Sequence, residues 1–424
     1  MVKACLLLYL LLTLSLHSFG EANDVWRETN IDKLKSSLLK NYDRFSRPED
    51  ASVTTNLFIS LTVIHMELHE TKGILETHAW IKLKWTDSKL KWNISDYDNI
   101  THFHVAADEI WTPDLTVYNS AEAQIIDHFA KTNKIIYSNG DVLWVPTAKF
   151  ETYCNMDLKI WPFDEQKCEI KIGSWTYNSF QINLQMDSET PIDAKSHYNN
   201  LEWEVLNGTA EHHEKFYSCC PEPYGDVTFY LNFRRRSPMF KAIALVPAAA
   251  IVFMTLTAFW LPPQAGEKLL LNGFACIMIC ILLMYFSQLL PILAASSPII
   301  VTIYSHTLYL LCISFIISVI VINMSRNRKH SPLPTAIKAI FLDGFIGKTF
   351  GSSQPNTIIG DYQAEELRKV PFEENSDDQI IQANIHTKAQ LIQNEWIHLA
   401  SIIDRIAFVI YVIIFILMGF IHFI

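Results

Sequence analysis

Four cysteines outside the long apolar stretches could form disulfides: Cys154, Cys168, Cys219 and Cys220. Four cysteines allow three pairings. Because two adjacent cysteines are hard to divide between distant partners, we predict the disulfides Cys154–Cys168 and Cys219–Cys220. The second is a strained link between neighbours that makes a tight turn. It is suited to shaping the tip of a loop rather than to stabilising a fold.

Motifs for enzyme chemistry are missing from the sequence. It has no G-x-S-x-G, no Walker loop, no H-E-x-x-H and no dinucleotide fingerprint. We therefore predict that the protein is not an enzyme, and we expect no cofactor. Two groups could contact a metal, His102 with His104 and the run His212-His213-Glu214. For both we favour ordinary loop residues, so no metal site is predicted.

The amino-acid composition narrows the class of protein to which these cysteines and histidines belong. Of its 424 residues, 50% are hydrophobic and 18% are charged, against about 25% charged in ordinary soluble domains. The 34 basic and 44 acidic side chains give a net charge of −10, which argues against a nucleic-acid partner. The apolar content excludes disorder of the whole chain, and the mean hydropathy of +0.14 suggests membrane segments.

Five apolar stretches set the topology. Residues 1–20 have a Lys, an apolar run and small residues near Gly20, as in a signal peptide. The later stretches at about 239–261, 269–290, 299–323 and 402–424 are each long enough to span a membrane. We predict an extracellular domain at 21–236, three spans within 237–323, a cytoplasmic segment at 324–401 and a last span at 402–424. Both ends of the mature chain are then extracellular.

Charges near the spans refine this topology. Lys241, Asp404 and Arg405 are expected to reach toward the membrane interface. Arg326, Arg328 and Lys329 follow the third span, as is typical of a cytoplasmic loop. Three arginines, Arg234 to Arg236, lie on the extracellular side just before the first span, which suggests a specific role for them.

The extracellular half has the period-two alternation of short strands. We expect a helix at 31–42 and strands at 57–68, 79–85, 134–137, 169–175 and 227–233, which together favour a β-sandwich. Three sequons, at Asn93, Asn99 and Asn207, predict glycosylation in surface loops.

The loop between Cys154 and Cys168 encloses 13 residues and contains Trp161-Pro162-Phe163-Asp164. This segment resembles the signature loop of the Cys-loop pentameric ligand-gated ion channels. Nearly the whole mature chain continues the resemblance, which is to nicotinic acetylcholine receptor α-type subunits and to a divergent, arthropod-like member. The runs that carry it are Trp85–Asn93, Trp111–Ser120, Gly173–Tyr177, Phe216–Tyr224 and Gly266–Lys268. The resemblance implies a ten-stranded extracellular sandwich, a four-helix membrane bundle and five subunits around a pore.

The resemblance also implies where an agonist binds. A quaternary ammonium cannot donate a hydrogen bond, but aromatic faces attract it by about 0.5–2 kcal/mol. The implied cage on the principal face is Tyr118, Trp175, Tyr217 and Tyr224, with Cys219–Cys220 at the tip of the closing loop. Trp80, with Leu143 and Val145 nearby, matches the complementary face that a neighbouring subunit offers. Core aromatic residues are the alternative interpretation; Trp85, Trp92, Trp111 and Trp203 are expected to be structural.

Two further groups are implied to transmit binding to the membrane. Lys171, Tyr217 and Asp226 match a polar trio in which loop closure brings the lysine to the tyrosine and away from the aspartate. Glu70 would pair with Arg235, close to the loop tip at Trp161–Asp164 and to the linker from Pro291 to Pro298. A solvated trio and a static salt bridge are the alternatives.

The second span is expected to line the pore. From Glu267, helical spacing predicts a stripe of Leu270, Phe274, Ile277, Ile281, Met284 and Gln288. Ile277 and Ile281 suit a hydrophobic gate, and a ring of Glu267 favours cations. Leu270 and Phe274 depart from the Ser or Thr usual in the family, and Gln288 replaces an acidic residue. We therefore expect a hetero-pentamer with reduced or altered conductance.

The preferred interpretation is a subunit of an acetylcholine-gated cation channel in the plasma membrane, at postsynaptic sites. Its expected partners are acetylcholine or a related quaternary ammonium agonist, other nicotinic subunits, the lipid bilayer and monovalent cations, with calcium left open. The alternative is a non-conducting regulatory subunit that binds agonist. An anion channel is disfavoured by Glu267.

In the cytoplasmic segment we expect an amphipathic helix at 334–350 and a helix at 377–400 that continues into the last span.

Overall fold

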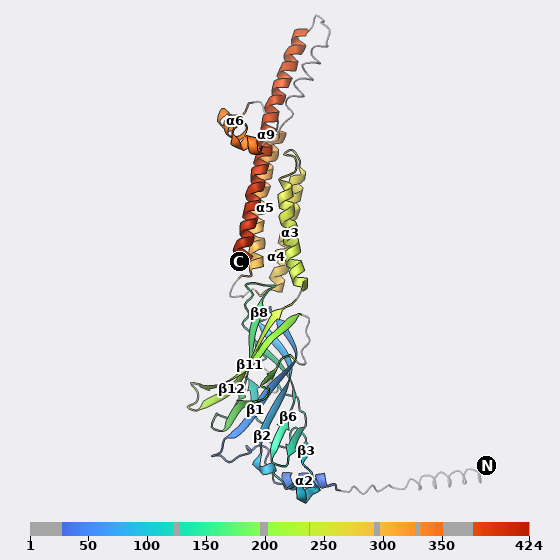
Figure 1. The fold of residues 1–424 in the computed structure, drawn as a ribbon, viewed down its shortest axis with the longest axis vertical. Coiled ribbons are helices and arrows are strands. Elements are labelled where there is room, and N and C mark those ends of the chain that lie inside the picture. Colours follow the sequence, from blue (N-terminus) through green and yellow to red (C-terminus); the bar gives the residue numbers. More distant parts are fainter. Residues whose placement is uncertain are drawn as a thin grey trace, which may run out of the picture.

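The computed structural model describes residues 28–122, 128–195, 202–236, 238–291, 297–327, 331–350 and 376–423. The predicted signal peptide and the polar segment 351–375 lie outside these ranges. The chain is elongated, with a β domain at one end and four long helices at the other (Figure 1). This separation is the one expected from the apolar stretches of the second half.

The β domain begins with helix α2 (Asn30–Leu39), which starts at a capping box made by Thr29 and Asp32. Twelve strands follow among the described residues: β1 (Thr55–His69), β2 (Ile74–Thr86), β3 (His102–Val105), β4 (Leu115–Val117), β5 (Lys134–Tyr137), β6 (Asp141–Trp144), β7 (Thr147–Tyr153), β8 (Glu165–Ser174), β9 (Ile182–Met186), β10 (Ile192–Asp193), β11 (Trp203–Phe216) and β12 (Pro223–Arg235). Ten were expected; short edge segments such as β10 raise the number. Two short helices, η1 (Ser88–Leu90) and η2 (Ile94–Tyr97), lie between β2 and β3.

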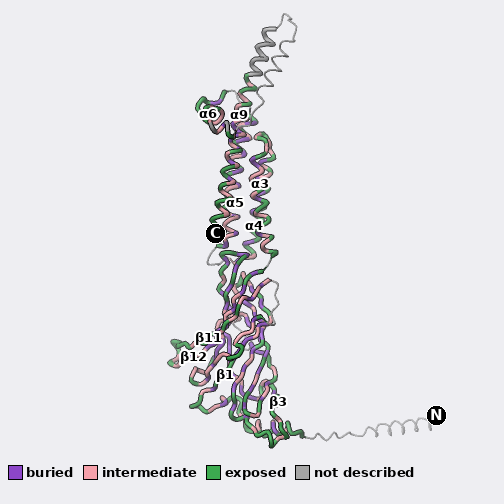
Figure 2. Tube along the Cα trace, in the orientation of Figure 1, coloured by how far each residue is buried: buried purple, intermediate pink, exposed green. Residues whose placement is uncertain are grey.

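The strands form two sheets. The larger has the order β10-β1-β2-β6-β5-β3, with β7 also paired to β2 and β9 to β1. The smaller has the order β11-β12-β8-β4. Alternate residues of β1, β2, β8 and β12 are buried, and they form one core between the sheets, shown by the buried positions in Figure 2. Trp85, Trp111 and Trp203 belong to that core, as expected, and Trp92 packs against it. The predicted sandwich is confirmed.

Four helices are long and apolar enough to span a membrane: α3 (Pro238–Ala258), α4 (Glu267–Leu289), α5 (Ile299–Arg326) and the apolar part of α9 (Ser376–Phe423). α9 is one continuous helix, as predicted for the segment that precedes the last span. The single helix expected at 334–350 is instead two, α6 (Thr335–Phe341) and α7 (Phe345–Phe350). Leu342–Gly344 separate them, and a side chain at Gly344 would approach the Ile340 carbonyl oxygen to 2.6 Å.

Polar side chains on the buried face of α4 bind it to α5 and α9. Lys268 and Asp404 are both buried and form an ion pair between α4 and α9. Asn272 donates to Ser318 on α5 over 3.1 Å and accepts from Ser314 over 3.3 Å. The expectation that Asp404 reaches toward the membrane interface was wrong, because Lys268 gives it a partner inside the bundle. Arg405 is exposed, and it donates to the Phe350 carbonyl oxygen.

The sandwich meets the helices at a buried arginine. Arg235, the last residue of β12, has a side chain that is fully buried. Its Nε and Nη2 bond to the two carboxylate oxygens of Asp164 over 2.8 and 3.2 Å. Its Nη1 lies 2.8 Å from Glu70 and 3.3 Å from Glu202. The expected Glu70–Arg235 contact is therefore present, within a larger group of carboxylates.

The loop closed by Cys154–Cys168 completes this junction. The structure pairs these cysteines, and the adjacent pair Cys219–Cys220. Trp161 is buried, with ring centroids 5.6 Å from Phe240 of α3 and 5.8 Å from Phe286 of α4. The Ile299 amide at the start of α5 donates to the Lys159 carbonyl oxygen over 2.9 Å. The loop thus touches three membrane helices. Residues 292–296 of the predicted α4–α5 linker lie outside the described ranges.

Candidate ligand site and pore face

Four aromatic residues gather at one end of the smaller sheet. Tyr118 follows β4, Trp175 follows β8, Tyr217 follows β11, and Tyr224 is the second residue of β12. The ring centroids are 6.4 Å apart for Tyr118 and Trp175, and 6.1 Å apart for Tyr217 and Tyr224, with the rings steeply inclined in both pairs. These are the four cage residues implied by the resemblance.

Asp114 fixes the turn that presents Trp175. Its carboxylate accepts from the Ser174 hydroxyl over 2.5 Å and from the Thr176 amide over 2.7 Å, and its carbonyl oxygen accepts from the Trp175 amide over 3.2 Å. β8 therefore ends at Ser174, one residue earlier than predicted. The Trp175 side chain is 69% exposed. The turn thus holds the indole at the surface, beside the ring of Tyr118.

Tyr118 lies directly over Gly173 of β8. A methyl group at Gly173 would come within 2.5 Å of the Tyr118 ring and hydroxyl. The hydroxyl donates to the Ser174 carbonyl oxygen. Burial raises the pKa of Tyr118, and the nearby Tyr217 and Asp226 raise it further. The hydroxyl therefore stays neutral, and Gly173 makes room for the ring.

The two tyrosines of the second pair flank the adjacent disulfide. The Cys220 amide donates to the Tyr217 carbonyl oxygen over 3.1 Å, which closes a turn between them. The ammonium of Lys215 lies 5.4 Å from the centroid of the Tyr217 ring. A cation can therefore rest against this ring in the folded chain, as a cation–π contact requires.

The polar trio is only partly assembled. Asp226 is buried, accepts from the Thr228 hydroxyl over 2.8 Å, and lies 3.5 Å from Nδ1 of His213. Lys171 has no ion pair with any residue that the structure describes. Lys171 and Thr228 are register partners, two pairs along from Asp226 and Gly173. The expected lysine–aspartate contact is therefore replaced by a histidine–aspartate contact.

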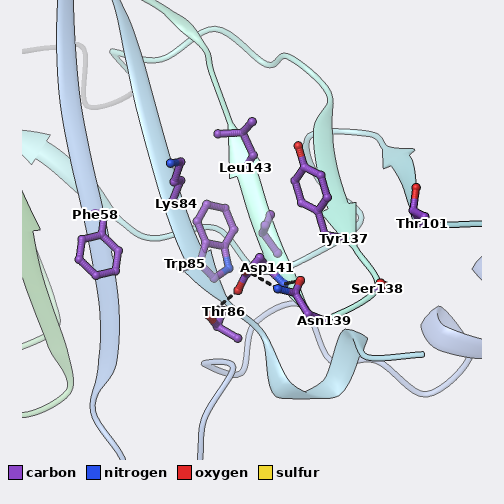
Figure 3. Close-up of a pocket in the computed structure, with 11 residues that line it drawn as sticks. Phe58, Lys84, Trp85, Thr86, Thr101, Tyr137, Ser138, Asn139, Asp141 and Leu143 are labelled. Atoms are coloured by element: carbon purple, nitrogen blue, oxygen red, sulfur yellow. Dashed lines mark hydrogen bonds between the residues drawn. The ribbon is translucent and has the colours of Figure 1, made fainter. Parts of the chain in front are cut away.

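The proposed complementary face lies on the larger sheet. Trp80 is 41% exposed on β2, Val145 is exposed after β6, and Leu143 is half-buried on β6. Leu143 also borders a hollow of about 750 Å³ over β1, β2, β5 and β6, drawn in Figure 3. The hollow has an aromatic side chain, Phe58, at one end and polar residues such as Asn139 and Asp141 at the other. Because the cage belongs to the smaller sheet, each chain carries two different candidate faces.

The predicted pore stripe lies on one exposed face of α4. All its members are exposed: Glu267, Leu270, Phe274, Ile277, Ile281, Met284 and Gln288. The buried face carries Lys268, Asn272, Ala275, Ile279 and Phe286. Glu267 and Lys268 are neighbours in sequence but differ in exposure, since Lys268 is directed into the bundle toward Asp404. The carboxylate therefore faces outward without its neighbouring cation.

The remaining predicted residues are less informative. Asn93 and Asn99 are exposed beside η2, whereas Asn207 is exposed within β11 and not in a loop as expected. His102 and His104 share the exposed face of β3, with ring centroids 6.0 Å apart. Among the described residues, no group of three or more His, Cys, Asp or Glu is arranged to hold a metal.

Sequence reasoning did not assign three residues to the site, Asp114, Gly173 and His213; it considered His213 only as a possible metal contact. Asp114 follows a proline within the Trp111–Ser120 run, a signal for a turn that could have identified it. Gly173 and His213 act through strand register, which connects positions far apart in the chain.

Two family profiles match the chain. The "Neurotransmitter-gated ion-channel ligand binding domain" matches residues 31–237 and the "Neurotransmitter-gated ion-channel transmembrane region" matches residues 244–358. The neuronal acetylcholine receptor subunit alpha-2 of Gallus gallus is 32% identical over 77% of this chain and 62% of its own length. The acetylcholine receptor subunit alpha-type acr-16 of Caenorhabditis elegans is 36% identical over 69% and 59%. The acetylcholine receptor subunit alpha-like 2 of Drosophila melanogaster is 32% identical over 76% and 56%. The chain thus spans about three fifths of the length of these relatives.

The contact between Tyr118 and Gly173 generates a prediction. The substitution Gly173→Ala should displace the Tyr118 ring and weaken the binding of a quaternary ammonium ligand about tenfold, since overpacking typically costs about 1–3 kcal/mol. Competition binding on cells that express the full chain measures this effect. Gly419→Ala is the matched control, because a methyl group there meets no atom within 4 Å. Equal affinities for the two variants would contradict the assignment.

Proposed function

The chain belongs to the neurotransmitter-gated ion-channel family, and on that basis we propose that it is an α-type subunit of an acetylcholine-gated cation channel. The family consists of ligand-gated channels and not of enzymes. The chain is a multi-pass membrane protein with an extracellular β-sandwich. The proposed assembly is a hetero-pentamer with other nicotinic subunits. Acetylcholine or a related quaternary ammonium compound is the proposed agonist.

The cluster of Tyr118, Trp175, Tyr217 and Tyr224 behind the Cys219–Cys220 disulfide is the observation that carries the proposal. Aromatic faces suit a cation that donates no hydrogen bond, because they attract it without needing a hydrogen-bond acceptor. The most exposed of these rings, Trp175, would make the closest contact. The cage is open on one side in the single chain, and the neighbouring subunit would close it with a face such as that of Trp80.

The exposed stripe of α4 supports the pore assignment. Five copies of Glu267 would form a ring of carboxylates at the cytoplasmic end, which favours cations. Lys268 would not cancel this charge, because Asp404 holds it inside the bundle. Ile277 and Ile281 would form the hydrophobic gate. The residues proposed to transmit binding to this pore are Glu70, Asp164, Arg235 and Pro291.

Leu270 and Phe274 favour a second candidate, a regulatory subunit that binds agonist but does not conduct by itself. Both side chains are exposed on the pore stripe, 75% and 65% respectively. They give a permeating ion no oxygen atoms. Five rings of Phe274 at one level would obstruct a narrow pore, whereas one or two among polar siblings would not.

Acetylcholine-evoked current tests the proposed function. The full chain is co-expressed in oocytes with a nicotinic sibling subunit, and surface labelling serves as the control for expression. We expect a current that reverses with the sodium gradient. The substitution Trp175→Ala should lower the agonist potency at least tenfold, because a desolvated cation–π contact contributes about 2 kcal/mol. Surface protein that suppresses the sibling's current would contradict the channel and favour the regulatory subunit.

The apolar level at Phe274 generates a second prediction. The substitution Phe274→Thr should raise the unitary conductance of the co-assembled receptor severalfold, because it replaces a ring with a hydroxyl group that can contact the ion. Single-channel recording measures this. The matched control is Phe253→Thr, on α3, where the ring is 69% exposed outside the pore-lining helix. An unchanged conductance in Phe274→Thr would contradict the placement of Phe274 in the narrow part of the pore.

A further inference from the structure

A histidine takes the place beside Asp226 at the base of the loop that carries Cys219–Cys220. His213 of β11 and Asp226 of β12 are register partners, so their side chains lie on one face of the smaller sheet. We propose that protonation of His213 ties up Asp226, leaves Lys171 free for Tyr217, and thereby makes agonist potency rise with acidity. This inference rests on the proposed function and assigns His213 as a positioning residue of the same site.

The two facing atoms of this contact, Nδ1 of His213 and the Asp226 carboxylate, are buried. Nδ1 of His213 lies 3.5 Å from Oδ1 of Asp226, whose side chain is only 3% exposed. Nδ1 is itself buried and has no hydrogen-bond partner among the residues that the structure describes. The only side-chain donor that the described residues offer to Asp226 is the Thr228 hydroxyl. The Asp226 carboxylate, which accepts from one neutral donor, can also accept a hydrogen bond from a protonated imidazole. Such a charge-assisted hydrogen bond is roughly twice as strong as one between neutral groups.

Charged groups face His213 from its own strand and from the neighbouring strands. On its own strand, Glu211 lies 3.5 Å from Nε2, so each ring nitrogen faces a carboxylate. From β12 the facing charge is Asp226. From β8 the nearest charged residue in the register is Lys171, opposite Thr228. Lys215, further along β11, has its ammonium over the Tyr217 ring.

Protonation changes what Asp226 offers to Lys171. With a neutral His213, the Asp226 carboxylate has no cationic partner among the described residues and is available to attract Lys171. With a protonated His213, the carboxylate is paired, and the attraction for Lys171 decreases. Lys171 then approaches Tyr217 at lower cost when the loop closes over the agonist. Acid should therefore stabilise the closed, agonist-bound arrangement, and the effect should saturate once His213 is fully protonated.

The neighbouring histidine supplies a matched control. His212 is on the same strand but projects to the opposite face, where its Nε2 would lie 3.3 Å from a methyl group on Gly225. Within the described part of the chain, no carboxylate lies within ion-pair distance of His212. The variants His213→Gln and His212→Gln each remove one imidazole from this strand, but only the first removes the partner of Asp226.

The test is the pH dependence of acetylcholine potency in the co-assembled receptor, between about pH 6 and pH 8, on either side of the ordinary imidazole pKa of about 6.5. In the native chain and in His212→Gln, the half-maximal concentration should fall about twofold to fivefold on acidification, within the range of a partly exposed ion pair. In His213→Gln it should stay constant. An equal pH dependence in all three, or a rise on acidification in the native chain, would overturn the inference.

A second measurement separates this inference from the proposed function. Hydrogen–deuterium exchange of β11 and β12 is measured on the detergent-solubilised full chain without agonist, with the variants compared at the same pH. At about pH 6 these strands should be more protected in the native chain and in His212→Gln than in His213→Gln, and at about pH 8 the three should agree. Failure of the channel function would leave this result intact. Equal protection at acid pH would overturn the His213–Asp226 contact even if the channel conducts.

Discussion

A single buried cation at the junction of the two halves constrains the rest of the structure. The Arg235 side chain is fully buried, and it is held by Asp164 and Glu70. Removing one partner of such a group typically costs about 3–5 kcal/mol, because it leaves an uncompensated buried charge. The loop of Asp164, the β1–β2 turn of Glu70 and the end of β12 must therefore stay together. This requirement fixes the sandwich relative to α3, which begins at Pro238.

The strand that ends at this arginine begins at the candidate ligand site. β12 starts with Pro223 and Tyr224, passes Asp226 and ends at Arg235, so 13 residues connect the aromatic cage to the junction. At about 3.3 Å per residue, the strand spans about 40 Å. A displacement of the loop at Cys219–Cys220 therefore acts on one end of β12, a strand that is paired with both β11 and β8. On the other side of the junction, Lys268 and Asn272 anchor one face of α4 in the bundle, and the opposite face, which we propose lines the pore, is exposed.

The sequence was informative where one residue's role depends on near neighbours. Alternation predicted β5 (Lys134–Tyr137) to the residue, and hydropathy located all four membrane helices. The sequence could not reveal contacts between distant residues. Lys268 and Asp404 are 136 positions apart, and Asp404 was expected at the interface because its partner was unknown. The Tyr118–Gly173 and His213–Asp226 contacts depend on strand register, which the alternation of a single strand does not specify. The cage residues themselves were recognised through the resemblance and not through their spacing.

A double-mutant cycle at the junction tests most directly whether Arg235 transmits binding. Glu70→Gln and Arg235→Lys are made singly and together in the co-assembled receptor, and the acetylcholine concentration for half-maximal current is measured, with surface labelling as a control. We expect a departure from additivity of about tenfold, or 1.4 kcal/mol. Glu165→Gln, which removes the exposed partner of Arg234, should combine additively with Arg235→Lys. Additive effects of Glu70→Gln and Arg235→Lys would contradict a role of the Glu70–Arg235 contact in transmitting binding.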